Sequence, residues 1–340
     1  MMKKRMLALG CALALVLGLT ACQKSEEMVT QQIFAMDTVM DFAVYGGDTE
    51  GFLAAAGQEI NRLESLLSRT REESDIYKVN EGGEVTVSRE TAELLEAALH
   101  YDDVTGGAFD MTIAPLVSAW GIHTDDPHVL SQKEVNALLP LVGSEHVHLD
   151  GSTVSLDKDC AVDLGGIAKG YASQQLAGLF EEYGITGGWV SLGGNVFTYG
   201  TKDGGQGWTV GIADPHNEPG NPAAVTLSNQ FAVTSGGYQR YYTAPDGTVY
   251  QHILDPKTGA PAVSDLLSVT IICQDGTMAD AYSTALYVMG EEGAIDFWRA
   301  HSTDFDLLLS TQDDRVMYTP GLEGNVVIPE GGRYTAQAIG

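Results

Sequence analysis

Apolar and polar residues alternate along this chain with two different periods. In residues 49–67, apolar side chains recur every three or four positions, which predicts an amphipathic helix. Residues 167–183 show the same spacing, and Gly184 is expected to end that second helix. A third helix is predicted over residues 278–289, because Gly290 follows the last residue of the pattern.

Shorter apolar runs predict strands between these helices. Residues 267–273 alternate as a half-buried strand does, and residues 188–199 read as a strand interrupted by Gly193 and Gly194. Because strands and helices mix without a regular βαβ period, the pattern predicts an α+β fold rather than a doubly wound one. The other predicted strands cover residues 36–45, 154–164, 208–212, 306–310 and 316–319.

The first residues have the layout of an export signal. Basic residues at positions 3–5 precede an apolar run over residues 6–19, which is too short to span a bilayer securely. The run ends in Leu-Thr-Ala-Cys, which resembles the lipobox of bacterial lipoproteins, so Cys22 is expected to carry a lipid. A plain secretory signal or an uncleaved anchor is the alternative.

This N-terminus defines the expected organisation of the chain. We expect a lipoprotein signal peptide over residues 1–21, a tether over residues 22–32 and a single large domain over residues 33–335. The domain is then expected outside the cytoplasm, held at a cell membrane through the lipid on Cys22.

The exported chain is strongly acidic. Removing the three basic residues at positions 3–5 from the total of 18 leaves 15 basic residues against 46 acidic ones, a net charge of −31. This charge argues against nucleic acid as a partner and against electrostatic binding to anionic lipid. Cys160 and Cys273 lie in apolar runs and are interpreted as small buried residues, with a disulfide between them left open.

A strand, a glycine-rich turn and a helix are predicted around Gly165 and Gly166. The N–H groups at a helix start carry partial positive charge and the glycines let a ligand approach the main chain, so this turn can hold a phosphate. Asp163 and Lys169 add one charge of each sign. The spacing fits neither a Walker loop nor a dinucleotide fingerprint, and an ordinary tight turn is the alternative.

Two further positions suggest chemistry. Asp280 and Thr284 are four residues apart in the third predicted helix, which puts a carboxylate and a hydroxyl on one face. Hard cations such as Mg²⁺ take oxygen ligands of this kind, although helix capping is the alternative use of Asp280. His252 can relay a proton or bond a ligand, or it can be structural. Because no nucleophile set has a local signature, phosphate chemistry with a metal is favoured over acyl transfer.

Seven segments, in order between residues 36 and 290, together resemble the FAD:protein FMN transferase family, often called ApbE. Each segment alone is weak, whereas seven in sequence are highly specific. They are Met36-Asp37-Thr38, Gly107-Ala108-Phe109-Asp110 with Pro115-Leu116, residues 163–170, Leu192-Gly193-Gly194-Asn195, Thr234-Ser235-Gly236, residues 252–259 and residues 279–286.

The resemblance implies an α+β, T-fold-like domain of mixed sheets and packed helices that uses FAD as its substrate. It implies Mg²⁺ ligands at the main chain of Gly166 and at Asp280, Ser283 and Thr284. Asp280 and His252 are predicted as the catalytic residues. Some relatives have glycine where Asp37 stands, so this chain carries an additional acid near the site. The implied flavin-contacting positions are Met36, Thr70, Ala108, Phe109, Asp110, Asp163, Lys169, His252 and Ile253.

Enzymes of this family attach FMN by a phosphoester to a Thr or Ser of a partner protein and release AMP. The implied partner is an exported flavin-accepting protein, such as a subunit of a membrane redox complex. The attacking hydroxyl needs a base, and the sequence leaves His252 and the carboxylates of the site open for that role. A Mg²⁺-dependent FAD pyrophosphatase and a non-catalytic flavin-binding lipoprotein are the two alternative functions.

Overall fold

The computed structural model describes residues 27–340, with the exception of residues 123, 203, 217–220 and 330. The predicted signal peptide, Cys22 and the first part of the predicted tether lie outside the described residues. Within the part of the chain that is described, no helix is both long and apolar enough to cross a bilayer.

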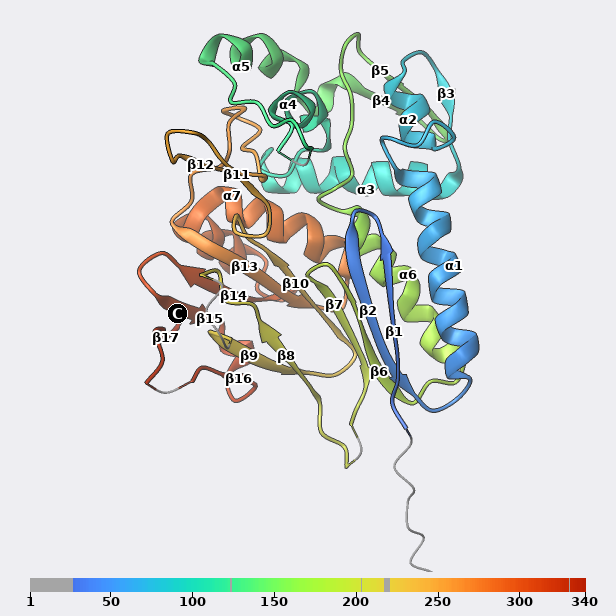
Figure 1. The fold of residues 1–340 in the computed structure, drawn as a ribbon, viewed down its shortest axis with the longest axis vertical. Helices are drawn as coiled ribbons and strands as arrows, with labels where there is room; N and C mark the ends of the chain where they lie inside the picture. Colours follow the sequence, from blue (N-terminus) through green and yellow to red (C-terminus); the bar gives the residue numbers. More distant parts are fainter. Residues whose placement is uncertain (1–26, 123, 203, 217–220, 330) are drawn as a thin grey trace, which may run out of the picture.

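A nine-stranded sheet lies at the centre of the molecule (Figure 1), with the strand order β1-β2-β6-β7-β10-β13-β14-β15-β17. Its neighbouring strands are antiparallel except for the last pair, β15 and β17. The strands are β1 (Val29–Ala35), β2 (Thr38–Tyr45), β6 (Gly187–Leu192), β7 (Asn195–Gly200), β10 (Gln230–Ser235), β13 (Leu266–Cys273), β14 (Asp306–Thr311), β15 (Arg315–Tyr318) and β17 (Thr335–Ala338).

Helices α1 (Thr49–Leu67), α6 (Ala168–Glu182) and α7 (Gly276–Ala300) pack against one another and against one face of this sheet (Figure 1). Successive side chains of a strand point to opposite faces, so Val233 of β10 packs on the helix side while Ala232 packs on the other. Burial on both faces explains why the central strands read as nearly continuous apolar runs.

Smaller elements surround this framework. A three-stranded sheet of β8, β9 and β16 covers part of the face opposite the helices, and α3 contacts α7. These elements are α2 (Asp75–Asn80), α3 (Arg89–Thr105), α4 (Ala114–Trp120), α5 (Gln132–Leu138), β3 (Val85–Thr86), β4 (Val147–Asp150), β5 (Thr153–Leu156), β8 (Trp208–Ile212), β9 (Ala223–Leu227), β11 (Tyr241–Thr243), β12 (Val249–Gln251) and β16 (Val326–Val327).

The α+β prediction is confirmed, and several element boundaries agree with the pattern. Helix α1 covers Thr49–Leu67 as predicted. Gly290 interrupts α7 with a φ of 75°, but the chain then resumes the helix. The side chain of Asp265 explains the restart, because its Oδ1 accepts a hydrogen bond from the main-chain N–H of Glu291 at 2.8 Å.

Two predictions from the pattern need correction. The strand predicted over residues 154–164 ends at Leu156, because the side chain of Asn80 bonds both main-chain groups of Val162 where a strand partner would otherwise do so. Residues 29–32, expected in the tether, belong to β1, since pairing with β2 satisfies their main chain. Cys160 and Cys273 are buried and unpaired, so the disulfide left open is not formed.

Candidate functional site

The first turns of α6 and α7 touch each other through two glycines. A Cβ placed on Gly170 would lie 2.2 Å from the carbonyl oxygen of Gly276 and 2.5 Å from the Cβ of Asp280. Only residues without a side chain permit such an approach. The two segments singled out in the sequence, residues 163–170 and 279–286, therefore adjoin in space.

Asp280 is buried at this junction and connects three elements. Its Oδ2 accepts a hydrogen bond from the main-chain N–H of Gly170 at 2.8 Å, and its Oδ1 accepts one from the Nδ2 of Asn195 at 3.2 Å. The Oδ1 of Asn195 is buried without a hydrogen-bond partner among the described residues. Asn195 belongs to the Leu192-Gly193-Gly194-Asn195 motif, but the motif predicts no role for its side chain.

Hydroxyl groups gather beside this carboxylate. The Oγ of Ser283 donates to the main-chain carbonyl of Asp280 at 2.9 Å and lies 2.8 Å from the Oγ of Ser235. The Oγ of Ser235 is also 3.4 Å from the Oγ1 of Thr284. Ser235, at the end of β10, is a second residue that belongs to a motif, Thr234-Ser235-Gly236, without a role predicted for its side chain.

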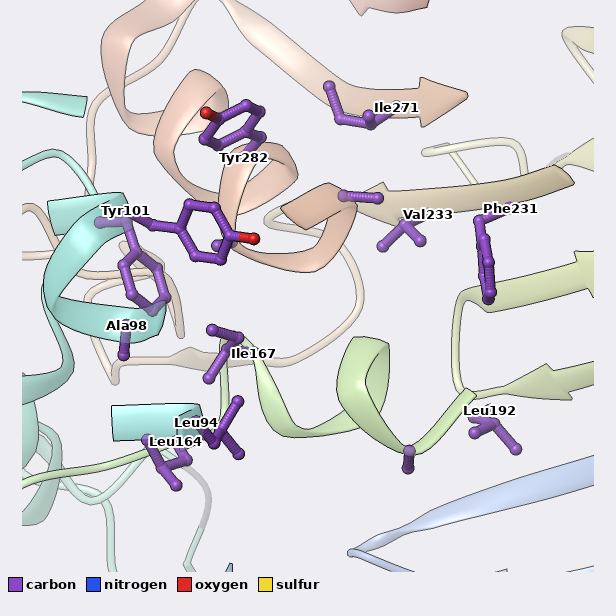
Figure 2. Packing of buried hydrophobic residues seen from close by; sticks show 14 of the residues in the cluster. Leu94, Ala98, Tyr101, Leu164, Ile167, Leu192, Phe231, Val233, Ile271 and Tyr282 are labelled. Carbon is purple, nitrogen blue, oxygen red and sulfur yellow. The ribbon is translucent and has the colours of Figure 1, made fainter. Parts of the chain in front are cut away.

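Gly166 lies against the same cluster. A Cβ at Gly166 would sit 3.2 Å from the Cε2 of Phe109 and 3.5 Å from the Oγ1 of Thr284. The flanking residues Leu164 and Ile167 are buried, and Figure 2 shows their side chains beside Leu94 of α3. The core therefore anchors both ends of the glycine turn and leaves Gly165 exposed.

The composition of this cluster fits one kind of ion. No group of three or more His, Cys, Asp or Glu side chains that could hold a metal occurs among the described residues. The cluster offers only oxygen atoms: the carboxylate of Asp280, the hydroxyls of Ser235, Ser283 and Thr284, and the unpartnered oxygen of Asn195. Mg²⁺ is usually bound by one or two carboxylates together with water and substrate phosphates, so the residues present fit this ion.

Charged groups line the mouth of the glycine turn. The Oδ1 of Asp163 accepts from the main-chain N–H of Gly165 at 2.6 Å, and its Oδ2 pairs with the Nε of Arg69 at 2.9 Å. The Nζ of Lys169 donates to the carbonyl of Gly165 at 3.1 Å. Thr70, one of the predicted flavin-contacting positions, is exposed and directly follows Arg69. The ion pair between Arg69 and Asp163 therefore places Thr70 close to Asp163.

Ala108, Phe109 and Asp110 follow the C-terminus of α3 and are buried. The Oδ1 of Asp110 accepts from both the main-chain N–H and the hydroxyl of Thr112, at 2.7 and 2.6 Å. Burial nevertheless raises the pKa of Asp110 to about 6, since the ionised form loses its hydration.

This raised pKa predicts a pH-dependent difference between the wild type and Asp110→Asn. The folded protein holds the proton of Asp110 more tightly than the unfolded chain, so this carboxyl destabilises the fold progressively as the pH rises from about 4 to about 6. Asparagine keeps an acceptor for Thr112 but does not ionise. The variant should therefore gain about 3 kcal/mol in unfolding free energy over the wild type across that range. Urea unfolding of both proteins at several pH values measures the difference, and parallel pH profiles would contradict it.

The remaining predicted positions lie around Arg240. Met36 and Asp37 form the turn between β1 and β2, and the guanidinium of Arg240 donates to the main-chain carbonyl of Asp37. The main-chain carbonyl of Arg240 accepts a hydrogen bond from the main-chain N–H of His252 at 3.1 Å. Ile253 is buried beside it. Arg240 thus connects the turn at Asp37 with His252, which lies far from it in the sequence. The sequence pattern assigned no role to Arg240.

Comparison with known proteins decides the family. The family model described as "ApbE family" matches residues 36–309 of the chain, which contain all of the residues of the candidate site. The chain belongs to the ApbE family. The resemblance stated from seven short motifs is thereby confirmed.

Individual relatives of the ApbE family extend over most of the chain. Curated proteins named FAD:protein FMN transferase from Treponema pallidum and Klebsiella pneumoniae are 33% and 32% identical to it, covering 85% and 80% of this chain and 86% of each relative. The crystal structure of an ApbE protein from Thermotoga maritima has a TM-score of 0.77 at 32% identity, over 89% of this chain and 97% of its own. The flavin transferase ApbE from Vibrio cholerae has a TM-score of 0.79 at 26% identity, over 88% and 99%.

Proposed function

We propose that this ApbE protein transfers FMN from FAD to a Thr or Ser hydroxyl of an acceptor protein and releases AMP. One observation supports the chemistry more than any other: the start of α6, with its glycine turn, lies against the buried Asp280 and the hydroxyls of α7. The names of the relatives, which are FAD:protein FMN transferases over most of the chain, support the same activity.

The reaction exchanges the phosphoanhydride bond of the diphosphate for a phosphoester bond to the acceptor. The acceptor oxygen forms a bond to the phosphorus nearer the flavin, and the bond from that phosphorus to the bridging oxygen of the diphosphate breaks. AMP leaves with the bridging oxygen, and the proton of the acceptor hydroxyl passes to a base. FAD is therefore a substrate, and no electrons are transferred.

Different residues at the contact between α6 and α7 would hold the metal ion and the diphosphate. The main chain of Gly166, together with Asp280, Ser283 and Thr284, would hold Mg²⁺. When bound, this ion neutralises the diphosphate and polarises the phosphorus under attack. Lys169 adds a positive charge at the start of α6, where the partial positive charge of the helix N-terminus already favours an anion.

Flavin binding would use the other side of the site. Phe109, beside Gly166, offers an apolar surface to the ring system, and Met36 and Ile253 add further apolar contacts. Asp110 and Asp163 offer carboxylates that can accept hydrogen bonds from the ligand. We propose His252 as the base that takes the acceptor proton, because a proton on its Nδ1, directed at the carbonyl of Arg240, leaves Nε2 unprotonated.

The N-terminal residues suggest where the reaction takes place. We propose that Cys22 is lipidated and that the domain works outside the cytoplasm on an exported acceptor, such as a flavin-carrying subunit of a membrane redox complex. The layout of residues 1–22 supports this proposal.

A transfer assay tests the proposed function. The purified protein is incubated with FAD, Mg²⁺ and an exported flavin-accepting protein, and the acceptor is examined by intact-mass analysis. We expect the acceptor to gain one FMN and one equivalent of AMP to appear. Free FMN and AMP without any gain in acceptor mass would support a pyrophosphatase instead, and intact FAD would support mere binding.

A further inference from the structure

The turn between β1 and β2 has an unusual main-chain conformation. Both of its residues lie in the left-handed region, with φ of 46° at Met36 and 62° at Asp37. Two-residue hairpin turns favour this geometry, but glycine and asparagine adopt it with less steric cost than methionine does. Such strain persists only where surrounding contacts hold it.

Contacts from two sides hold this turn. On the side of α1, Glu64 accepts a hydrogen bond from the main-chain N–H of Met36 at 3.0 Å and pairs with Arg71 at 2.6 Å. On the opposite side, Arg240 donates to the main-chain carbonyl of Asp37, and its Nη1 lies 3.5 Å from the Asp37 carboxylate. Arg240 directly precedes β11, so it ties the β11–β12 hairpin to the edge of the central sheet.

The main chain of Arg240 holds His252 at the same time. Its carbonyl oxygen lies 3.1 Å from the main-chain nitrogen of His252 and 3.0 Å from the ring Nδ1. The second contact is a hydrogen bond only when Nδ1 carries the proton, so it selects the tautomer whose Nε2 is basic. Arg240 therefore contacts the turn through its side chain and the imidazole of His252 through its main-chain carbonyl.

We propose that Arg240 is a positioning residue that fixes the imidazole of His252 relative to the Met36–Asp37 turn. The inference rests on the proposed transferase function, in which the turn contacts the flavin and His252 takes the acceptor proton. The Asp37–Arg240 ion pair is too exposed to contribute much to stability, with 74% and 38% of the two side chains accessible. The ion pair instead contributes by keeping His252 in position, because displacing a catalytic base by about 1 Å can lower the reaction rate a hundredfold.

A double-mutant cycle between Arg240 and His252 tests this role. Arg240→Ala should lower kcat for FMN transfer by about ten- to a hundredfold, while the thermal midpoint changes little. In a His252→Ala background the same substitution should leave kcat almost unchanged, because no base remains to be positioned. Arg240→Lys, which keeps a charge able to reach Asp37, should restore part of the loss. Arg89→Ala, which removes an exposed pair with Glu93, is the matched control and should leave kcat as it is.

Two outcomes would overturn the proposal. The first is a loss in the double variant equal to the product of the single losses, since Arg240 would then act independently of His252. The second comes from ¹⁵N spectra of the His252 ring, which need no turnover: the Nδ1–H tautomer should dominate in the wild type and decline in Arg240→Ala, and an unchanged tautomer would contradict the inference. If the wild type forms no covalent FMN product, the proposed function fails, and the tautomer result alone then decides on Arg240.

Discussion

Replacing Asp280 by alanine should lower the rate of FMN transfer by on the order of a thousandfold, the loss typical of removing a preorganised electrostatic group from a reacting centre. Asp280 is the only carboxylate among the four positions proposed to hold Mg²⁺. It also receives the N–H of Gly170 and the amide of Asn195, so its loss removes the contact that keeps the start of α6 against α7. The measurement is kcat for covalent labelling of the acceptor at saturating FAD and Mg²⁺.

The alanine variant needs a control that separates chemistry from folding. Alanine leaves the two donors to Asp280 without a partner, at a cost of about 1–3 kcal/mol for each buried group. Asp280→Asn has nearly the same shape and can still accept from Gly170, while Asn195 can turn its unpartnered oxygen towards the new amide. This variant should unfold close to the wild-type midpoint, remain inactive and lose the stabilisation that Mg²⁺ with FAD confers. Wild-type turnover in Asp280→Asn would refute the metal assignment.

Gly170→Ala should destabilise the protein by about 1–3 kcal/mol or more, because an added methyl overpacks the contact between α6 and α7. Its Cβ would lie 2.2 Å from the carbonyl oxygen of Gly276 and 2.5 Å from the Cβ of Asp280, and backbone atoms cannot move aside as a flexible side chain can. The helices must separate, which also pulls Asp280 from its place. Urea unfolding should therefore show a lower midpoint, and the folded variant should transfer FMN more slowly.

Gly178→Ala is the matched control for this prediction. Gly178 lies in the same helix α6, and a Cβ there would meet nothing within 4 Å. Alanine favours the helix over glycine, so this variant should be more stable than the wild type by about 0.5–1 kcal/mol. Equal effects of the two substitutions would show that helix propensity, rather than the close contact of the two helices, governs the Gly170 position.

Local patterns predicted much of the framework. The spacing in α1 predicted Thr49–Leu67 because one helix face is buried along its whole length. The pattern misplaced the strand end after Leu156 because Val162 and Leu164 are apolar for burial in the core, not for pairing in a sheet. A segment that is buried without pairing in a sheet has the same apolar sequence pattern as a buried strand.

The residues of the candidate site also fall into two groups, those that the sequence predicted and those that it did not. Gly166, Lys169, Asp280 and Thr284 were found from the sequence, because each stands in a motif or at a helical spacing that carries its own chemical meaning. Asn195, Ser235 and Arg240 received no individual role, because their roles depend on partners that no local pattern reveals. Asn195 acts on a carboxylate 85 positions away, and Arg240 reaches a turn 203 positions away.

The sequence by itself determined the α+β class, the ApbE family and the two segments on which the chemistry depends, because periodicity and motifs are properties of neighbouring residues. Only the tertiary structure decided that these segments meet. Gly170 and Asp280, 110 residues apart, share a hydrogen bond because glycines at the start of both helices permit close contact. Long-range packing of this kind is set by the whole core, and no short stretch of the chain encodes it.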